Sequence, residues 1–241
     1  VKTPELDPGD NSKGLGYSSY FALDITDVNN PQLLWEFTHE ELGFATAGPA
    51  VVRVSVRDVA NSPLPDRNGK WFVVLASGPT GPIDKDSRQF MGRSDQNLKL
   101  FVLDLKTGAL LRPPLDTGEQ FAFAGSMLNS TFDADLDYQD DVVYIPYVQK
   151  DASASPEPTW TNGGVLRLST KEDPDPATWA VSTLIDSGIG PVTSAVAKLQ
   201  NRNSNTIWVY FGTGRYFYEQ GATTDDADGK RQLFGIKEPC Y

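Results

Sequence analysis

The sequence predicts an all-β fold, most simply a β-propeller, and three observations support this prediction. Strand-like apolar runs recur along the whole chain, amphipathic helical periodicity is nearly missing, and one strand-turn pattern repeats. Turn-forming sequences such as DVNNP, DRNGK, KTG and TNGG separate the runs, which is typical of an all-β chain. The clearest strands are expected at 20–26, 33–37, 49–56, 71–78, 98–105, 141–148, 164–169, 193–199, 206–214 and 232–237.

The repeat consists of an apolar pair, an aspartate, a short turn and a second apolar strand. It occurs around Asp24 in ALDITDVNNPQLLWEF and around Asp104 in VLDLKTGALL, and LRLSTKEDPDPATWAVSTLI carries Ser169 in the aspartate position. Successive copies are about 65 to 80 residues apart, which leaves room for about four short strands in each period. The chain would then form a partial propeller of a little over three four-stranded blades. Closure would need residues outside this sequence or a partner, and a β-sandwich of similar strand density is the structural alternative.

Residues 1–241 are expected to form a single β-propeller domain or part of one. Two segments, 78–97 and 149–164, are rich in Gly, Pro, Ser and charge and are long for ordinary connections. We interpret both as surface loop insertions between blade strands rather than linkers between domains. Long loops on a rigid β scaffold often carry binding function. A variable, solvated excursion is the alternative for each segment.

The composition argues against several functional classes. A formal net charge of -11 argues against a nucleic-acid partner, because phosphate contacts need clustered Lys and Arg. A single cysteine, Cys240, and a single histidine, His39, exclude an intrachain disulfide and Cys/His zinc sites. No stretch approaches the roughly 18 apolar residues of a membrane helix, so no membrane span is expected in this chain. A chain that begins with Val1 is expected to be processed or part of a longer one.

An aspartate-rich loop precedes the strand predicted at 141–148. With Asp133 as position 1, the loop places aspartates at positions 1, 3, 5 and 9, namely Asp133, Asp135, Asp137 and Asp141. The main-chain carbonyl of Gln139 is available at position 7. Calcium takes six to eight oxygen ligands, and alternating side chains of a tightly wound loop converge on one point, as in an EF-hand. The spacing therefore predicts a divalent cation site, and calcium suits it better than magnesium.

The match to an EF-hand loop is incomplete. Tyr138 stands at position 6 instead of Gly, Tyr144 stands at position 12 instead of Glu, and no helices are predicted on either side. Asp141 must therefore close the ligand shell, and Asp140 is expected to point away. A solvated acidic turn without any metal is the alternative hypothesis for this loop.

Several segments together resemble the C-terminal propeller domain of the PilY/PilC family, the tip-associated adhesins and biogenesis factors of bacterial type IV pili. The resemblance runs from about residue 14 to residue 237, and the order of the segments is more specific than any one of them. The segments are GLGYSSYFALDITDVNNPQLLWEF, LKLFVLDLKTGALL, DADLDYQDD with VVYIPYV, GGVLRL, WVYFGTGRYF and QLFGIK.

The resemblance implies a calcium-binding propeller module that is not an enzyme and that acts in pilus biogenesis and surface adhesion. It implies calcium as the cofactor, with Asp133, Asp135, Asp137 and Asp141 as ligands and Gln139 binding through its carbonyl. Many loops of the family have Gly or Asn where this chain has Tyr138. The implied partners are minor pilins or the remaining N-terminal part of the same protein. The implied location is extracellular, at the pilus tip or the outer-membrane surface of a bacterium.

A quinoprotein dehydrogenase that uses pyrroloquinoline quinone is the alternative function. ALDITD and VLDLKTG also look like the blade-turn motif of that family of propellers. Against it stand the incomplete number of blades, a moderate tryptophan content at the turns, and the lack of a convincing catalytic base.

Overall fold

The computed structural model describes residues 18–58, 60–64, 68–81, 92–153, 159–204, 206–215, 219–220, 223–224 and 231–239. Cys240 lies outside this part of the chain. Across the described ranges the only helical element is a short 3₁₀ turn, η1 (Pro176–Thr178), so the expected all-β fold is confirmed. Within them, no helix has the length and apolar character that crossing a membrane would require.

The strands form four main antiparallel sheets, which follow one another in chain order. The first sheet pairs β1 (Tyr20–Asp24) with β2 (Gln32–Phe37). The second contains β3 (Ala50–Val54), β4 (Lys70–Ala76), β5 (Lys99–Asp104) and β6 (Leu115–Asp116). The third contains β7 (Ala122–Ala124), β8 (Thr131–Phe132), β9 (Val142–Asp151), β10 (Thr159–Ser169) and β11 (Ala180–Ile185). The fourth contains β12 (Ala197–Asn201), β13 (Thr206–Gly212) and β16 (Leu233–Lys237), and β14 (Glu219–Gln220) forms a small hairpin with β15 (Thr223–Thr224).

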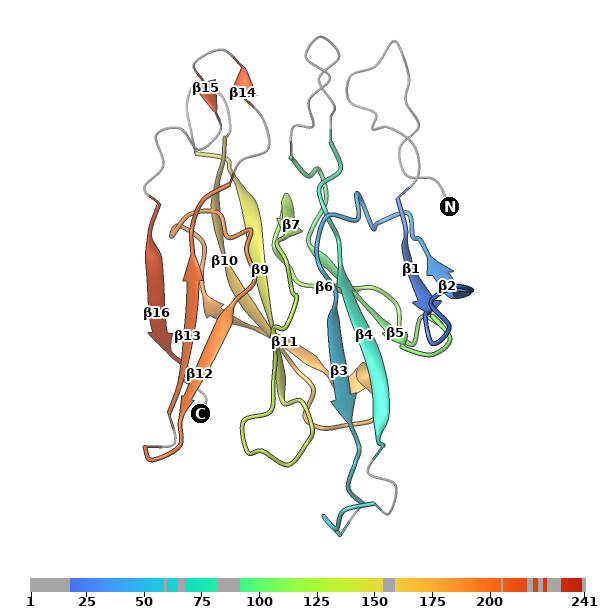
Figure 1. Ribbon diagram of the computed structural model, residues 1–241. Helices are drawn as coiled ribbons and strands as arrows, with labels where there is room; N and C mark the ends of the chain where they lie inside the picture. The colour runs from blue at the N-terminus through green and yellow to red at the C-terminus, as the bar shows by residue number, and fades with distance from the viewer. Residues whose placement is uncertain are drawn as a thin grey trace.

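The four sheets are antiparallel, and most neighbouring strands are consecutive in the chain; the exceptions are β9, which pairs with both β7 and β8, and β13, which pairs with β16. Neighbouring strands in the second sheet are consecutive in the chain, β3-β4-β5-β6, and the third sheet follows the order β7-β9-β10-β11. Figure 1 shows the four sheets side by side in chain order, from blue β1 and β2 to red β16. This arrangement is that of successive propeller blades, and the described strands form no closed ring, consistent with a partial propeller. The described strands do not form the two-layer β-sandwich that was the alternative.

The two middle sheets are buried on both faces, which is what stacking between blades requires. In β4, Val73 and Leu75 pack against the first sheet, whereas Phe72 and Val74 pack against the third sheet. Strand β9 repeats the alternation: Val143, Ile145 and Tyr147 face the second sheet, while Val142 and Tyr144 face the fourth. Among the described residues, three apolar cores therefore lie between the four sheets, and each of these cores is shared by two neighbouring sheets.

The sequence repeat marks equivalent places in three sheets. Asp24, Asp104 and Ser169 are the last residues of β1, β5 and β10, as predicted. The aspartate shapes the turn that follows, because the Oδ1 of Asp104 accepts the main-chain N–H groups of Lys106 (3.0 Å) and Thr107 (2.8 Å). Oδ1 of Asp24 accepts the main-chain N–H of Thr26 at 2.8 Å in the same way.

The prediction that 149–164 is a loop is wrong for most of its described length. Strands β9 and β10 continue into the segment, and the pairs Gln149↔Asn162 and Asp151↔Thr159 extend the hairpin. The TNGG sequence looks like a turn, but both glycines lie inside β10. Glycine is needed there because neighbouring backbone approaches both positions closely. A Cβ at Gly163 would lie 2.2 Å from the carbonyl oxygen of Tyr147. Residues 154–158 lie outside the described part, as do 82–91 of the other expected insertion, 78–97.

Candidate metal centre

The aspartate-rich loop, residues 133–141, joins β8 to β9 at one end of the third sheet. Phe132 pairs with Val142 at the base of the loop, and the main-chain N–H of Asp141 donates to the carbonyl oxygen of Phe132 at 2.9 Å. The loop is therefore a long hairpin turn whose ends are fixed by the sheet. The sheet also brings β10 alongside, because Ser169 pairs with Val142.

Asp133 winds the loop around its own carboxylate. Its Oδ1 accepts the main-chain N–H groups of Leu136 (2.6 Å) and Asp137 (3.1 Å), and its Oδ2 accepts that of Tyr138 (2.8 Å). Two non-glycine residues take left-handed backbone conformations in this winding, Leu136 (φ 66°) and Tyr138 (φ 76°). Tyr138 thus has the conformation that glycine usually supplies at this position of such a loop, at a cost of about 1 to 2 kcal/mol. The loop keeps its shape despite the departure noted in the sequence.

The structure brings all four predicted aspartate ligands together in two overlapping groups. Carboxylate oxygens of Asp133, Asp135 and Asp141 lie within 4.8 Å of one another, and so do those of Asp135, Asp137 and Glu172. Two oxygens on opposite sides of a calcium ion are about 5 Å apart, since each lies at roughly 2.3 to 2.6 Å from the ion. The oxygen-only donor set and its spacing therefore fit calcium, with Asp135 common to both groups.

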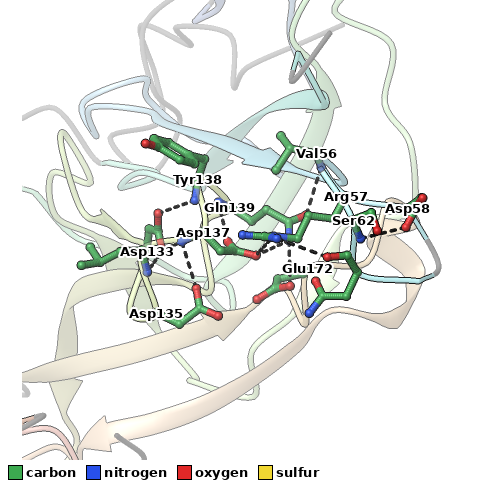
Figure 2. Close-up of polar contacts among 12 residues, drawn as sticks. Val56, Arg57, Asp58, Ser62, Asp133, Asp135, Asp137, Tyr138, Gln139 and Glu172 are labelled. Atoms are coloured by element: carbon green, nitrogen blue, oxygen red, sulfur yellow. Dashed lines mark hydrogen bonds and ion pairs between the residues drawn. The ribbon is translucent and has the colours of Figure 1, made fainter. Parts of the chain in front are cut away.

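Glu172 is the member of the site that the sequence analysis missed. It follows β10 and reaches the loop from a different hairpin, and its Oε2 accepts a hydrogen bond from Nε2 of Gln139 at 2.8 Å. Figure 2 shows its carboxylate directed toward Asp135. The sequence places Glu172 three residues after Ser169. This position indicates a role in the site only once the strand register is known, because the register places Ser169 beside Val142 at the end of the loop.

Gln139 and Asp140 tie the loop to the second sheet. The buried side chain of Gln139 accepts the main-chain N–H of Val56 at 3.1 Å through Oε1 and donates to Oδ2 of Asp137 at 2.8 Å through Nε2. The role expected for the Gln139 carbonyl stays a prediction. Asp140 is directed away from both carboxylate groups, as expected, because its Oδ2 accepts the main-chain N–H of Arg53 at 2.7 Å.

Burial and mutual repulsion raise the pKa of several carboxyl groups in this cluster. Burial raises the pKa of Glu172 to about 7, and the charges of Asp137, Asp141 and Asp135 add to the rise. The pKa of Asp135 is raised by burial and by the charge of Asp137, and the pKa of Asp141 is raised mainly by burial. Without a cation, Glu172, Asp135 and Asp141 therefore hold protons more tightly than they would in the unfolded chain.

The raised pKa of Glu172 makes the stability of the calcium-free protein depend on pH. Glu172 has a higher pKa in the folded state than its ordinary value of 4.5, so the folded state binds more protons between about pH 4.5 and 7. The Glu172 contribution is therefore present below pH 4.5 and is lost as pH rises to about 7. We expect Glu172→Gln to flatten the fall in melting temperature over this window in chelator-treated protein. Glu40→Gln, an exposed carboxylate outside the cluster, is the control and should follow wild type; equal slopes for all three proteins would contradict the expectation.

The chain is similar in sequence to type IV pilus biogenesis factors along most of its length. The chain is 26% identical over 242 residues to the type IV pilus biogenesis factor PilY1 of Pseudomonas aeruginosa, a match that covers 92% of the chain. It is 23% identical over 212 residues to the PilY1 homolog of Xylella fastidiosa, covering 84% of the chain. The chain is homologous to the PilY1 proteins. It spans 18% of the length of the P. aeruginosa PilY1 and 14% of the X. fastidiosa homolog.

The fold is also that of a solved PilY1 domain. The crystal structure of the P. aeruginosa PilY1 C-terminal domain superimposes with a TM-score of 0.59 at 24% identity, covering 91% of this chain and 43% of the solved chain. No family model matches the chain. The resemblance inferred from the order of segments is thus confirmed, and the shared part is the C-terminal domain of PilY1.

Proposed function

We propose that this chain is a calcium-binding propeller module of a type IV pilus-associated protein that acts in pilus biogenesis and surface adhesion. The observation that carries the calcium proposal is the pair of carboxylate groups that share Asp135, in a loop whose main-chain N–H groups donate to the Asp133 carboxylate. The homology to PilY1 supports the pilus role. Asp133, Asp135, Asp137 and Asp141 would hold the ion with the Gln139 carbonyl, and Glu172 would add a carboxylate from the neighbouring hairpin.

Calcium would act here as a structural brace between the second and third sheets. The loop contacts the second sheet through the Asp140–Arg53 and Gln139–Val56 hydrogen bonds. It contacts the end of β10 where the main-chain N–H of Thr170 donates to the carbonyl oxygen of Asp141 at 2.9 Å. An ion that offsets the repulsion among the carboxylates would therefore stabilise the junction of three chain segments.

The test is a calorimetric calcium titration of chelator-treated wild type and Asp135→Ala. Wild type should bind, and calcium at a hundredfold excess over Kd should raise the free energy of unfolding by about 2.7 kcal/mol. Asp135→Ala removes the carboxylate that both groups share, so its affinity should fall by about tenfold or more. Asp27→Ala, an exposed aspartate in the β1–β2 turn, is the matched control and should titrate like wild type. Equal heats in all proteins, or no heat in any, would make the loop a solvated acidic turn.

We propose the remaining N-terminal part of the same protein and minor pilins as partners, at the pilus tip or outer-membrane surface. Two exposed apolar sheet faces support a partner that would cover them. The face of the first sheet exposes Phe21 and Leu33, and that of the fourth sheet exposes Leu199 and Trp208.

We also propose that the chain is not an enzyme. The purified chain should then not reduce dye when pyrroloquinoline quinone and an alcohol or a sugar are added; reproducible turnover would instead favour the quinoprotein dehydrogenase.

A further inference from the structure

A cavity of about 400 Å³ lies beside the aspartate-rich loop, between that loop and the segment after β3. Its walls are formed by Arg53, Val56, Arg57, Pro63 and the pair Asp137–Tyr138. Strand β3 ends at Val54, and Ser55 takes a left-handed backbone conformation (φ 61°) that turns the chain. Two guanidinium groups therefore line one cavity in a chain whose net charge is -11.

The side chain of Arg53 is held in place and still has hydrogen-bond donors available for a ligand. Its guanidinium carbon lies 5.3 Å from the ring centroid of Trp71 and 5.8 Å from that of Tyr138, and its Nε donates to the carbonyl oxygen of Tyr138 at 2.8 Å. Among the described residues, its two terminal nitrogens have no hydrogen-bond partner. A guanidinium fixed by two aromatic rings loses little further freedom when it binds a planar anion through two parallel hydrogen bonds.

Arg57 supplies the second cation on the same cavity. Its Nε donates to Oδ2 of Asp137 at 2.9 Å and its Nη1 to the carbonyl oxygen of Asn61 at 3.3 Å. Figure 2 shows Arg57 reaching the loop from the segment that carries Val56 and Asp58. These contacts fix the side chain, and its second terminal nitrogen makes no hydrogen bond within the described part of the chain.

We propose that this cavity binds a carboxylate attached to a compact body with an apolar face. The guanidinium fork of Arg53 matches the geometry of a carboxylate, and Arg57, which pairs with Asp137, adds a further hydrogen-bond donor. Val56, Pro63 and the Tyr138 ring form apolar walls. The volume suits a ligand the size of one sugar ring or one amino-acid side chain rather than an extended strand. The carboxylate could belong to a sugar acid or to an acidic side chain, and the experiment separates these sources.

The cavity and the aspartate-rich loop share a wall, so binding of the carboxylate depends on calcium; this step rests on the proposed function. Asp137 belongs to one of the carboxylate groups and also lines the cavity. Without a cation, the carboxylates of the loop repel an incoming anion, and an ion among them removes much of that repulsion. Because coupling between two sites is reciprocal, the carboxylate should also strengthen calcium binding by the same factor.

Saturation-transfer NMR on the whole chain tests the proposal with D-glucuronate and N-acetyl-L-glutamate amide as probes. With millimolar calcium at least one probe should bind, and chelation should weaken its binding; the tighter probe identifies the source of the carboxylate. Arg53→Gln should lower probe affinity by about tenfold, and Arg53→Lys should restore only part of it. Arg57→Gln is a second variant, and Arg202→Gln, an exposed arginine in the β12–β13 turn, should behave like wild type.

A calcium titration of each protein distinguishes the two proposals. Arg53→Gln should keep its calcium heat while it loses the probe. If wild type binds calcium but neither probe, or if inorganic phosphate displaces the probe with equal affinity, the carboxylate site is overturned and the calcium proposal stands. If calcium gives no heat and a probe still binds, the coupling between the sites is overturned.

Discussion

Replacing Glu238 with alanine is expected to lower the free energy of unfolding by about 3 to 5 kcal/mol, because it removes one partner of a buried ion pair. Glu238 follows β16 and is fully buried, and it forms an ion pair with Arg167 of β10, which is 8% exposed. Its Oε2 also accepts the hydroxyl of Tyr144 at 2.9 Å. The change therefore breaks a charged link between the third and fourth sheets.

Urea unfolding followed by tryptophan fluorescence measures this effect. Glu40→Ala, an exposed glutamate, is the matched control and should stay within about 0.5 kcal/mol of wild type. The double variant Glu238→Leu with Arg167→Leu should lose less stability than Glu238→Ala, since it replaces both buried charges of the ion pair with apolar side chains. A Glu238→Ala protein as stable as the control would show that water reaches the ion pair.

Phe101→Ala is expected to cost about 3 to 5 kcal/mol of unfolding free energy, because it opens a cavity in the core between the first and second sheets. Phe101 is fully buried in β5, and its ring meets that of Phe37 edge-on at a centroid distance of 5.7 Å. Thermal and urea unfolding should both report the loss.

Leu34→Ala provides the control for Phe101→Ala. Leu34 is 51% exposed on β2, so its truncation removes apolar atoms without forming an internal cavity. We expect its effect to stay below about 1 kcal/mol. Comparable losses in both variants would mean that the first sheet does not pack on Phe101 in solution.

Local sequence patterns predicted the main strands and the convergence of the aspartate carboxylates, because both depend on short-range rules. Alternating apolar residues and turn sequences placed the main strands, and the spacing of Asp133 to Asp141 predicted which carboxylates converge. Features that depend on contacts between distant segments were not predicted from the sequence. Glu172 joins the cluster only through the β9–β10 register, and the paired glycines of β10 looked like a turn because the backbone that crowds them comes from elsewhere in the fold.

The cavity beside the loop illustrates the same limit. Arg53 and Arg57 gave no signal in the sequence, because their value as a pair depends on the bend at Ser55 and on the ring of Tyr138 more than 80 residues further along the chain. The sequence alone does not indicate that Arg53 lies between the rings of Trp71 and Tyr138.

The three shared cores couple each sheet only to its neighbours in the row, so the unfolding of one sheet directly affects only the sheets beside it. Each middle sheet has neighbours on both faces, whereas the first and fourth sheets each share one core among the described residues, so the ends should open before the centre does. Amide hydrogen exchange should accordingly be slowest in β4 and β9 and faster toward β1 and β16. The aspartate-rich loop lies at the junction of the two middle sheets, so an ion bound there would slow the last step of global unfolding and leave the outer sheets free to adapt to whatever they contact.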